Sequence, residues 1–316
     1  MKQHRIVVVL GGNALGDTPQ QQAEAAAATA RVIAQLIAAG HQVIVSHGNG
    51  PQVGLIQNAM TALAEEEPRQ GETPLFLSGA MSQGYIGFDL QNALRRALQQ
   101  QNLDRSVCTV LTQCAVDPED PAFRNPSKPI GRHLSAREAK EVARKTGYLM
   151  KEDAGRGYRR YVPSPLPRQI VEKDSIRTLW EHGSVVICCG GGGVPVVAKN
   201  GGWQGVDAVI DKDFAAALLA EEVDADLLVI LTAVEKVAIN FRRADEQWLS
   251  VLTPEQAAQY EAQGHFAAGS MLPKVQAAAR FAASRPGRRA VITLPELAAQ
   301  GIAGTAGTSV QMASPS

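Results

Sequence analysis

Three lysines occur in contexts that suggest chemistry on a phosphoryl group. Lys128 lies between two prolines in an Asn-Pro-Ser-Lys-Pro-Ile-Gly run, Lys212 lies between two aspartates, and Lys274 follows a Met-Leu-Pro run. Phosphoryl transfer needs cations around the moving group more than covalent chemistry from the protein. Lys212 and Lys274 are expected at the starts of helices, where a cation is unfavourable with the helix dipole and needs another reason to be present. The alternative for each is a solvated surface charge.

Two aspartates flank Lys212. Asp211 and Asp213 could position the lysine ammonium groups or bind Mg²⁺. A plain helix N-cap is the alternative for Asp213, and the two roles can coexist. No Ser-His-Asp or Cys-His arrangement and no cluster with metal-ligand spacing is apparent in the sequence.

Four segments, three of them glycine-rich, follow predicted strands directly, at residues 11–13, 47–51, 190–193 and 232–233. The carboxyl ends of strands in an open α/β sheet form one ligand-binding edge, so these loops should converge there. Glycine lets the backbone approach a phosphate, and amides at helix starts point toward an anion. The spacing matches neither the dinucleotide fingerprint nor the P-loop. His47 is expected to fix its loop by hydrogen bonds rather than to act as a general base.

Short apolar runs alternate with longer helical stretches along most of the chain. Continuous apolar strands are typical of a parallel sheet covered by helices on both faces. The sequence therefore predicts a three-layer α/β/α sandwich with an open, mostly parallel sheet. The predicted strands are 5–10, 42–46, 106–111, 184–189, 226–231 and 289–293, with helices at about 20–39 and 214–222.

One stretch, 117–168, is rich in proline and charge and departs from this pattern. A capping-box pattern at Ser135 and Glu138 predicts a short polar helix within it. We expect a single domain over 1–316 with 117–168 inserted as a small protruding lid subdomain. A solvated surface loop is the alternative.

Composition limits the possible partners and compartment. The 316 residues include 31 Lys and Arg against 31 Asp and Glu, so no positive field is available to hold nucleic acid or an anionic membrane. Two of the four cysteines, Cys188 and Cys189, are adjacent in an apolar run and are expected in the core. We find no signal peptide or membrane-spanning run and expect a soluble, cytoplasmic protein.

The motifs resemble those of carbamate kinases in the amino acid kinase superfamily. The resemblance covers about residues 6–310, and the Lys-Pro-Ile-Gly, Glu-Asp-Ala-Gly-Arg-Gly and Met-Leu-Pro-Lys runs are specific to carbamate kinases. Its principal motifs lie at 10–14, 46–54, 111–118, 125–131, 152–158, 162–165, 189–195, 209–214, 264–266 and 269–274.

The resemblance implies an amino acid kinase-like fold, usually assembled as a homodimer. It also implies Mg²⁺-dependent, reversible phosphoryl transfer between ATP and carbamate, giving ADP and carbamoyl phosphate. The family often makes ATP in this way during arginine, agmatine or allantoin breakdown. Because carbamate already carries a nucleophilic oxygen anion, no general base is needed.

The resemblance also assigns roles to individual residues. Lys128 would reach from the lid to the transferring group, Lys212 and Lys274 would neutralise its charge, and Asp213 would hold the lysines. The residues that would cradle the carbamoyl phosphate side are Gly11, Gly12, Asn13, Gly48, Asn49 and Gly50. The residues expected around the nucleotide are Asp211, Thr232, Ala233, Val234, Val237, Phe266, Met271 and Lys274.

Three local departures from the family pattern occur, at 77–81, at Ala233, where many members have Gly, and at Lys236, where some have Tyr. Lys236 could change the contacts to adenine. Two alternatives stay open. One is another kinase of the superfamily, acting on acetylglutamate, glutamate, aspartate or UMP. The other is a non-catalytic protein that binds carbamoyl phosphate or nucleotide.

Overall fold

The computed structural model describes residues 3–11, 18–153 and 155–313. Its centre is an eight-stranded sheet whose neighbouring strands are parallel, apart from the antiparallel β16–β17 pair. The predicted open, mostly parallel sheet is therefore confirmed. In spatial order its strands are β15 (Val251–Leu252), β17 (Thr308–Gln311), β16 (Arg289–Thr293), β12 (Leu227–Leu231), β1 (Arg5–Leu10), β2 (Gln42–His47), β9 (Val185–Ile187) and β3 (Val107–Thr109).

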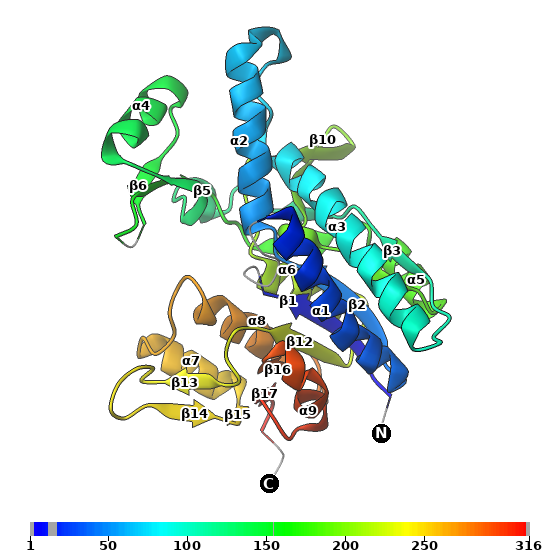
Figure 1. Ribbon diagram of the computed structural model, residues 1–316. Helices are drawn as coiled ribbons and strands as arrows, with labels where there is room; N and C mark the ends of the chain where they lie inside the picture. Colours follow the sequence, from blue (N-terminus) through cyan, green and yellow to red (C-terminus); the bar gives the residue numbers. More distant parts are fainter. Residues whose placement is uncertain (1–2, 12–17, 154, 314–316) are drawn as a thin grey trace.

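Helices cover both faces of this sheet (Figure 1). Alternate residues of β1 pack into two separate clusters, because successive side chains of a strand point to opposite faces. One face is covered by α5 (Lys173–Glu181), α6 (Lys212–Glu222) and α8 (Met271–Ala283), with α7 (Pro254–Ala262) against α8. The other is covered by α1 (Pro19–Ala38), α3 (Leu75–Gln100) and α9 (Ala298–Ala303). The predicted three layers are thus confirmed.

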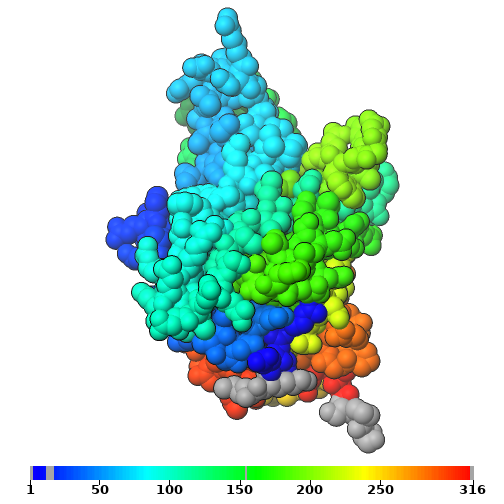
Figure 2. Space-filling view, turned by 90° about the vertical axis from the view of Figure 1, so that its right-hand side faces the viewer, coloured from blue at the N-terminus to red at the C-terminus, as the bar shows by residue number. Residues whose placement is uncertain are grey.

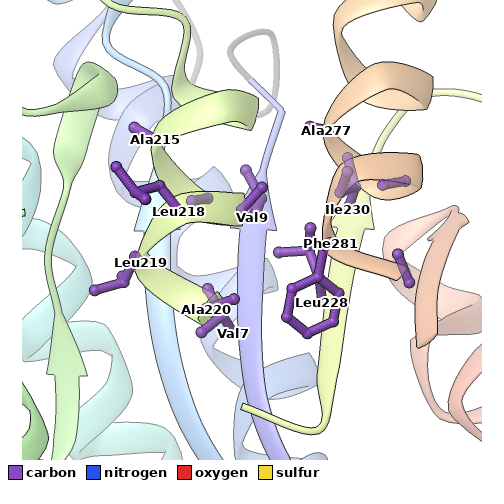
Figure 3. Close-up of a cluster of buried hydrophobic side chains, with 14 of the residues drawn as sticks. Val7, Val9, Ala215, Leu218, Leu219, Ala220, Leu228, Ile230, Ala277 and Phe281 are labelled. Atoms are coloured by element: carbon purple, nitrogen blue, oxygen red, sulfur yellow. The ribbon is translucent and has the colours of Figure 1, made fainter. Parts of the chain in front are cut away.

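Helices α6 and α8 are fixed against the middle of the sheet by close apolar packing. Leu218 and Leu219 of α6 and Phe281 of α8 lie over Val7, Val9 and their neighbours on β12, all of them buried (Figure 3). Interiors of this density resist displacement of the packed elements. The N-termini of both helices are therefore held in fixed positions at the carboxyl edge of the sheet.

Besides the sheet of the 117–168 segment, two further small sheets in the described residues were not predicted. One has the order β11 (Gly202–Gly205), β10 (Val194–Lys199), β4 (Gln113–Val116) and β8 (Pro167–Ile170). The other is a hairpin of β13 (Val237–Ile239) and β14 (Gln247–Leu249). Their strands are short, and most are partly exposed, so they lack the continuous apolar runs that mark the central strands.

The 117–168 segment contains ordered structure, and the solvated-loop alternative is wrong. It forms the sheet β5–β7–β6 from β5 (Lys128–Leu134), β6 (Met150–Glu152) and β7 (Tyr158–Val162), together with α4 (Ala136–Thr146). The capping box at Ser135 and Glu138 is confirmed. Ile130 and Val162 pack against α2 (Gly50–Glu66), so the segment shares a small core with that helix and projects beside it (Figure 1).

Some predicted element boundaries were wrong by a few residues. The strand predicted over 184–189 ends at Ile187 because Cys189 turns into a left-handed conformation, with φ of 53°. The strand predicted over 106–111 covers only Val107–Thr109. Cys188 and Cys189 are buried without a disulfide, as expected of core cysteines. Among the described residues, no helix is long and apolar enough to cross a membrane.

Candidate active site

A cavity of about 780 Å³ opens where β1, β12 and β16 end and where α6 and α8 begin. Its walls include Gly11, Thr232 and Pro295 from the strand ends, and Lys212 and Lys274 from the two helices. Large ligand cavities of α/β sheets typically lie at this edge. The cavity is thus placed to bring a ligand directly against the two lysines.

One buried carboxylate holds both of these lysines. Lys212 Nζ lies 3.0 Å and Lys274 Nζ 3.1 Å from the same oxygen, Oδ2 of Asp213. The Asp213 side chain is only 2% exposed, and its other oxygen, Oδ1, has no partner within the described structure. The lysines approach from different helices, so Asp213 fixes the spacing between two cations that would otherwise repel each other.

The third lysine reaches this cluster from the inserted segment. Lys128 begins β5, and its Nζ lies 2.6 Å from Asp211 Oδ2. Asp211 is only 12% exposed, and it precedes Lys212 at the start of α6. The structure therefore brings the four predicted catalytic residues Lys128, Lys212, Lys274 and Asp213 into one cluster, joined through Asp211.

Asp211, not Asp213, is the N-cap of α6. The Asp211 side chain accepts a hydrogen bond from the backbone N–H of Asp213 at 3.0 Å, and the helix begins at Lys212. The plain N-cap alternative for Asp213 and the predicted helix start at Phe214 are both wrong. The cap lies two residues earlier because Asp211 has the extended backbone that an N-cap requires.

Burial and neighbouring charges shift the pKa values within the cluster in different directions. Burial lowers the pKa of Lys274, and the nearby Lys212 adds to this effect, so the Asp213 carboxylate compensates only in part. Burial opposes the charge of Lys212 too, but Asp213 and Asp211 together outweigh it and raise its pKa. Burial acts against the Asp211 carboxylate, yet Lys128 and Lys212 lower its pKa overall. Both lysines therefore depend on the Asp213 and Asp211 carboxylates to remain charged in a buried site.

The cluster has the electrostatics of an anion site. Three ammonium groups face two carboxylates, and the N-termini of α6 and α8 add partial positive charge at the same edge. An incoming phosphoryl group would complete the charge balance. Cations at helix starts are unfavourable by themselves, and Asp211 and Asp213 compensate for that cost here.

The loop after β2 is fixed by close packing against the 190–193 loop. A Cβ on Gly190 would overlap the His47 imidazole, and a Cβ on Gly191 would overlap the Asn49 amide. His47 Nδ1 lies 2.9 Å from the carbonyl oxygen of Gly48, and complete burial lowers the pKa of His47 to about 4. His47 is therefore neutral at physiological pH and ties its own loop, consistent with the structural role predicted for it.

Helix α2 begins without a side-chain cap. Asn49 is its N-cap residue, but the Asn49 side chain donates to Ser82 Oγ at 2.8 Å and makes no capping hydrogen bond. The first N–H groups of a helix need partners from outside the helix. Gly48, Asn49 and Gly50 therefore lie at the uncapped start of α2, whereas Gly12 and Asn13 lie outside the described residues.

The predicted nucleotide-binding residues fall into two groups. Thr232, Ala233, Val234, Met271 and Lys274 do line the cavity. The other three predicted residues do not: Val237 and Phe266 are buried in the core, and Asp211 instead holds Lys128.

The outer wall of the cavity was not predicted from the sequence. This wall is formed in part by the β13–β14 hairpin, which contributes Phe241, Arg243 and Trp248. Phe241 and Trp248 pack edge to face with ring centroids 6.0 Å apart, and both are about half exposed. Lys236 also lines the cavity, and its Nζ donates to Ser250 Oγ at 3.0 Å. Two partly exposed aromatic residues seven positions apart do not form a recognisable motif.

Comparison with known proteins defines the class. The model of the amino acid kinase family matches residues 4–293. The chain therefore belongs to the amino acid kinase family.

Within that family the chain is similar over nearly its whole length to carbamate kinases, which confirms the resemblance read from the motifs. A carbamate kinase-like protein of Escherichia coli, YqeA, is 53% identical over 97% of this chain and 98% of its own. The carbamate kinase of Staphylococcus haemolyticus is 47% identical over 97% of this chain and 99% of its own. The structure of carbamate kinase from Giardia lamblia bound to AMP-PNP superimposes with a TM-score of 0.90 at 40% identity, covering 98% of this chain and 99% of that one.

Proposed function

We propose that this protein is a carbamate kinase that transfers a phosphoryl group reversibly between ATP and carbamate. The observation that carries the proposal is the cluster in which two carboxylates hold Lys128, Lys212 and Lys274, two of which, Lys212 and Lys274, line the 780 Å³ cavity. Full-length similarity to carbamate kinases supports this substrate over others.

The lysines act on the charge of the transferring group. Lys212 and Lys274 line the cavity and, once a nucleotide is bound, face its terminal phosphates. Lys128 approaches from the side of the inserted segment, so the phosphoryl group passes between cations from both directions. Fixed donors of this kind stabilise a phosphoryl transition state without reorganisation. No proton acceptor is required, because carbamate attacks as an oxyanion, and neutral, buried His47 is not placed for that task.

Magnesium fits this site mainly as a partner of the nucleotide. In the described part of the chain no three His, Cys, Asp or Glu side chains are grouped to hold a metal, and Asp211 and Asp213 already bind lysines. A Mg²⁺ ion would therefore be held chiefly by nucleotide phosphates and water. When bound, Mg²⁺ supplies additional neutralisation of phosphate charge.

Residues 117–168 act in this proposal as a lid inserted in a single domain over 1–316. The support is that Lys128, at the start of β5, forms a direct ion pair with the core at Asp211. The lid would bring the carbamate end of the site together with the nucleotide end. ATP formation from carbamoyl phosphate, as in arginine, agmatine or allantoin breakdown, is the proposed direction of use, and cytoplasmic localisation stays a prediction.

A homodimer is the proposed assembly. Helix α3 exposes Leu77, Met81, Gly84 and Phe88 at spacings of four, three and four residues, which places them along one side of the helix. Phe88 is 67% exposed. Helix α3 is seen in cyan to teal on the face shown in Figure 2. A second copy lying against the exposed side of α3 would cover this stripe. Sedimentation of wild type and of a Phe88→Glu variant tests this: the variant should be monomeric.

A panel of acceptors tests the reaction itself. Purified protein with Mg²⁺ and ATP should phosphorylate carbamate and leave acetylglutamate, glutamate, aspartate and UMP unchanged. Preference for any of the latter would identify another kinase of the superfamily. Nucleotide binding without turnover on any acceptor would favour the non-catalytic alternative.

A further inference from the structure

A second cavity lies at the opposite edge of the central sheet from the lysine cluster. It has a volume of about 330 Å³ and lies where β1, β2 and β9 begin. Arg5, His41, Arg105, Trp180 and Ser184 are among its lining residues. The nucleotide cavity lies at the carboxyl edge of the same sheet, where β1, β12 and β16 end, so the two cavities are separate.

The walls of this second cavity carry hydrogen-bond donors and no carboxylate. Among the described residues that line it there is no Asp or Glu, whereas two are arginines. His41 Nδ1 accepts a hydrogen bond from the backbone N–H of His4 at 3.1 Å, so the neutral imidazole carries its proton on Nε2. Such a set of side chains is complementary to an acceptor-rich ligand.

Two buried donors at this cavity lack a partner in the described structure. Trp180 is only 1% exposed, yet its Nε1–H makes no hydrogen bond, and Arg5 Nε is likewise buried and unpaired. Buried polar groups without partners are uncommon and costly. The Arg5 guanidinium lies 4.4 Å from the centre of the Trp180 ring, so the two unpaired donors belong to neighbouring groups.

The two arginines differ in how firmly they are held. Arg5 donates to the carbonyl oxygen of Val223 at 3.2 Å and lies 3.6 Å from Glu181 Oε1. Arg105 is exposed and has no ion pair or hydrogen bond to any described residue. Arg5 is therefore a fixed positive wall, and Arg105 is the guanidinium that a ligand could engage.

We propose that this cavity, lined by Arg5, Arg105 and Trp180, is a binding site for a small oxyanion, a phosphate or a carboxylate. Guanidinium groups bind both kinds of oxyanion with paired, charge-assisted hydrogen bonds. A volume of about 330 Å³ is at the lower end for ligand cavities, which favours a small anion over a nucleotide.

Tryptophan fluorescence can report on this site directly. The chain has three tryptophans, and Trp203 and Trp248 are 42% and 47% exposed, so a Trp203→Phe, Trp248→Phe variant leaves Trp180 as the only reporter. Inorganic phosphate and succinate are titrated separately into this variant, with Mg²⁺ and ADP at saturation to occupy the nucleotide cavity. Arg105→Ala is made in the same background, with Arg69→Ala, an exposed arginine elsewhere, as the matched control.

The proposal predicts a saturable change in Trp180 emission with at least one of the two anions. Loss of a charge-assisted hydrogen bond should weaken this binding about tenfold or more in Arg105→Ala and leave Arg69→Ala unchanged. The tighter of the two anions identifies the ligand class. Absence of a saturable change with either anion, or equal binding in Arg105→Ala, would overturn the proposal. No turnover is measured, so the outcome does not depend on the proposed kinase activity.

Discussion

Lys128 and Asp211 are 83 positions apart in the sequence, yet their side chains form an ion pair of 2.6 Å. One begins the first strand of the inserted segment and the other caps α6 of the core. The contact joins the two parts of the molecule immediately beside Lys212. It explains how a lysine on a projecting segment can serve a site built on the central sheet.

Replacing Lys128 by alanine should lower kcat by about 10²–10³, because one fixed cation at the transferring group is lost. The change removes a partly exposed side chain from the segment, so the fold should be retained. Steady-state kinetics and circular dichroism measure the two effects. Lys140→Ala, an exposed lysine on α4, serves as the control and should keep wild-type kcat.

Asp213 should be important for stability as well as for activity. Asp213→Asn leaves the ammonium groups of Lys212 and Lys274 without their shared carboxylate, and breaking a buried ion pair in this way costs about 3–5 kcal/mol. Denaturant unfolding gives the free energy directly. Lys274→Met should lower the free energy of unfolding less in the Asp213→Asn background than in wild type. Strictly additive losses of unfolding free energy would show that Asp213 does not hold Lys274.

Lys274 itself should be needed for turnover. A Lys274→Ala enzyme is expected to lose about 10²–10³ in kcat, for the same electrostatic reason as Lys128→Ala. Lys128 lies on β5 of the inserted segment and Lys274 on α8 of the core. Comparing the two variants therefore separates the contribution of the inserted segment to kcat from that of the core. A folded Lys274→Ala enzyme with a near-wild-type rate would remove this residue from the proposed mechanism.

Stability should fall at acid pH because of His47. Its pKa is lowered to about 4 by burial, against about 6.5 in an unfolded chain, so the unfolded state binds the extra proton first as the pH falls. The contribution of neutral His47 to the free energy of unfolding is fully present above pH 6.5. It is lost between pH 6.5 and pH 4, by about 3 kcal/mol in total. Unfolding free energies at pH 7 and 5 measure the slope. His47→Gln should reduce this pH dependence, whereas substitution of an exposed histidine, His182→Gln, should not change it.

Gly191 should tolerate no side chain. Its φ is +64°, and an added Cβ would overlap the Asn49 amide, so Gly191→Ala should displace the loop before α2 and lower both stability and activity. Gly79 in α3 is the matched control, because an added Cβ meets no atom within 4 Å. Gly79→Ala should be neutral or stabilise the protein by up to about 1 kcal/mol. Equal effects of the two substitutions on thermal unfolding would contradict this account.

Some of the fold and site could be predicted from sequence because the signals are local. The central strands are continuous apolar runs, and Ser135 and Glu138 form the capping box that they predict. The lysines stand out by their proline and aspartate neighbours. These features each depend on a few consecutive residues.

Other features depend on contacts that no short pattern records. Two lysines sharing one oxygen of Asp213, and the pairing of Lys128 with Asp211, arise from the packing of separate elements. Val237 and Phe266 were expected at the nucleotide, but both lie in the core, since an apolar residue near a binding motif can face either way. Trp248 lies on a short, exposed strand without apolar alternation, and its place in the cavity wall had no signal in the sequence.

The central claim is tested most directly by ATP formation from carbamoyl phosphate, ADP and Mg²⁺, measured in a coupled absorbance assay with wild type and Lys128→Ala side by side. The account predicts robust ATP formation by the wild type and a loss of about 10²–10³ in the variant. Folded wild-type protein that binds ADP and forms no ATP would contradict the proposed carbamate kinase activity.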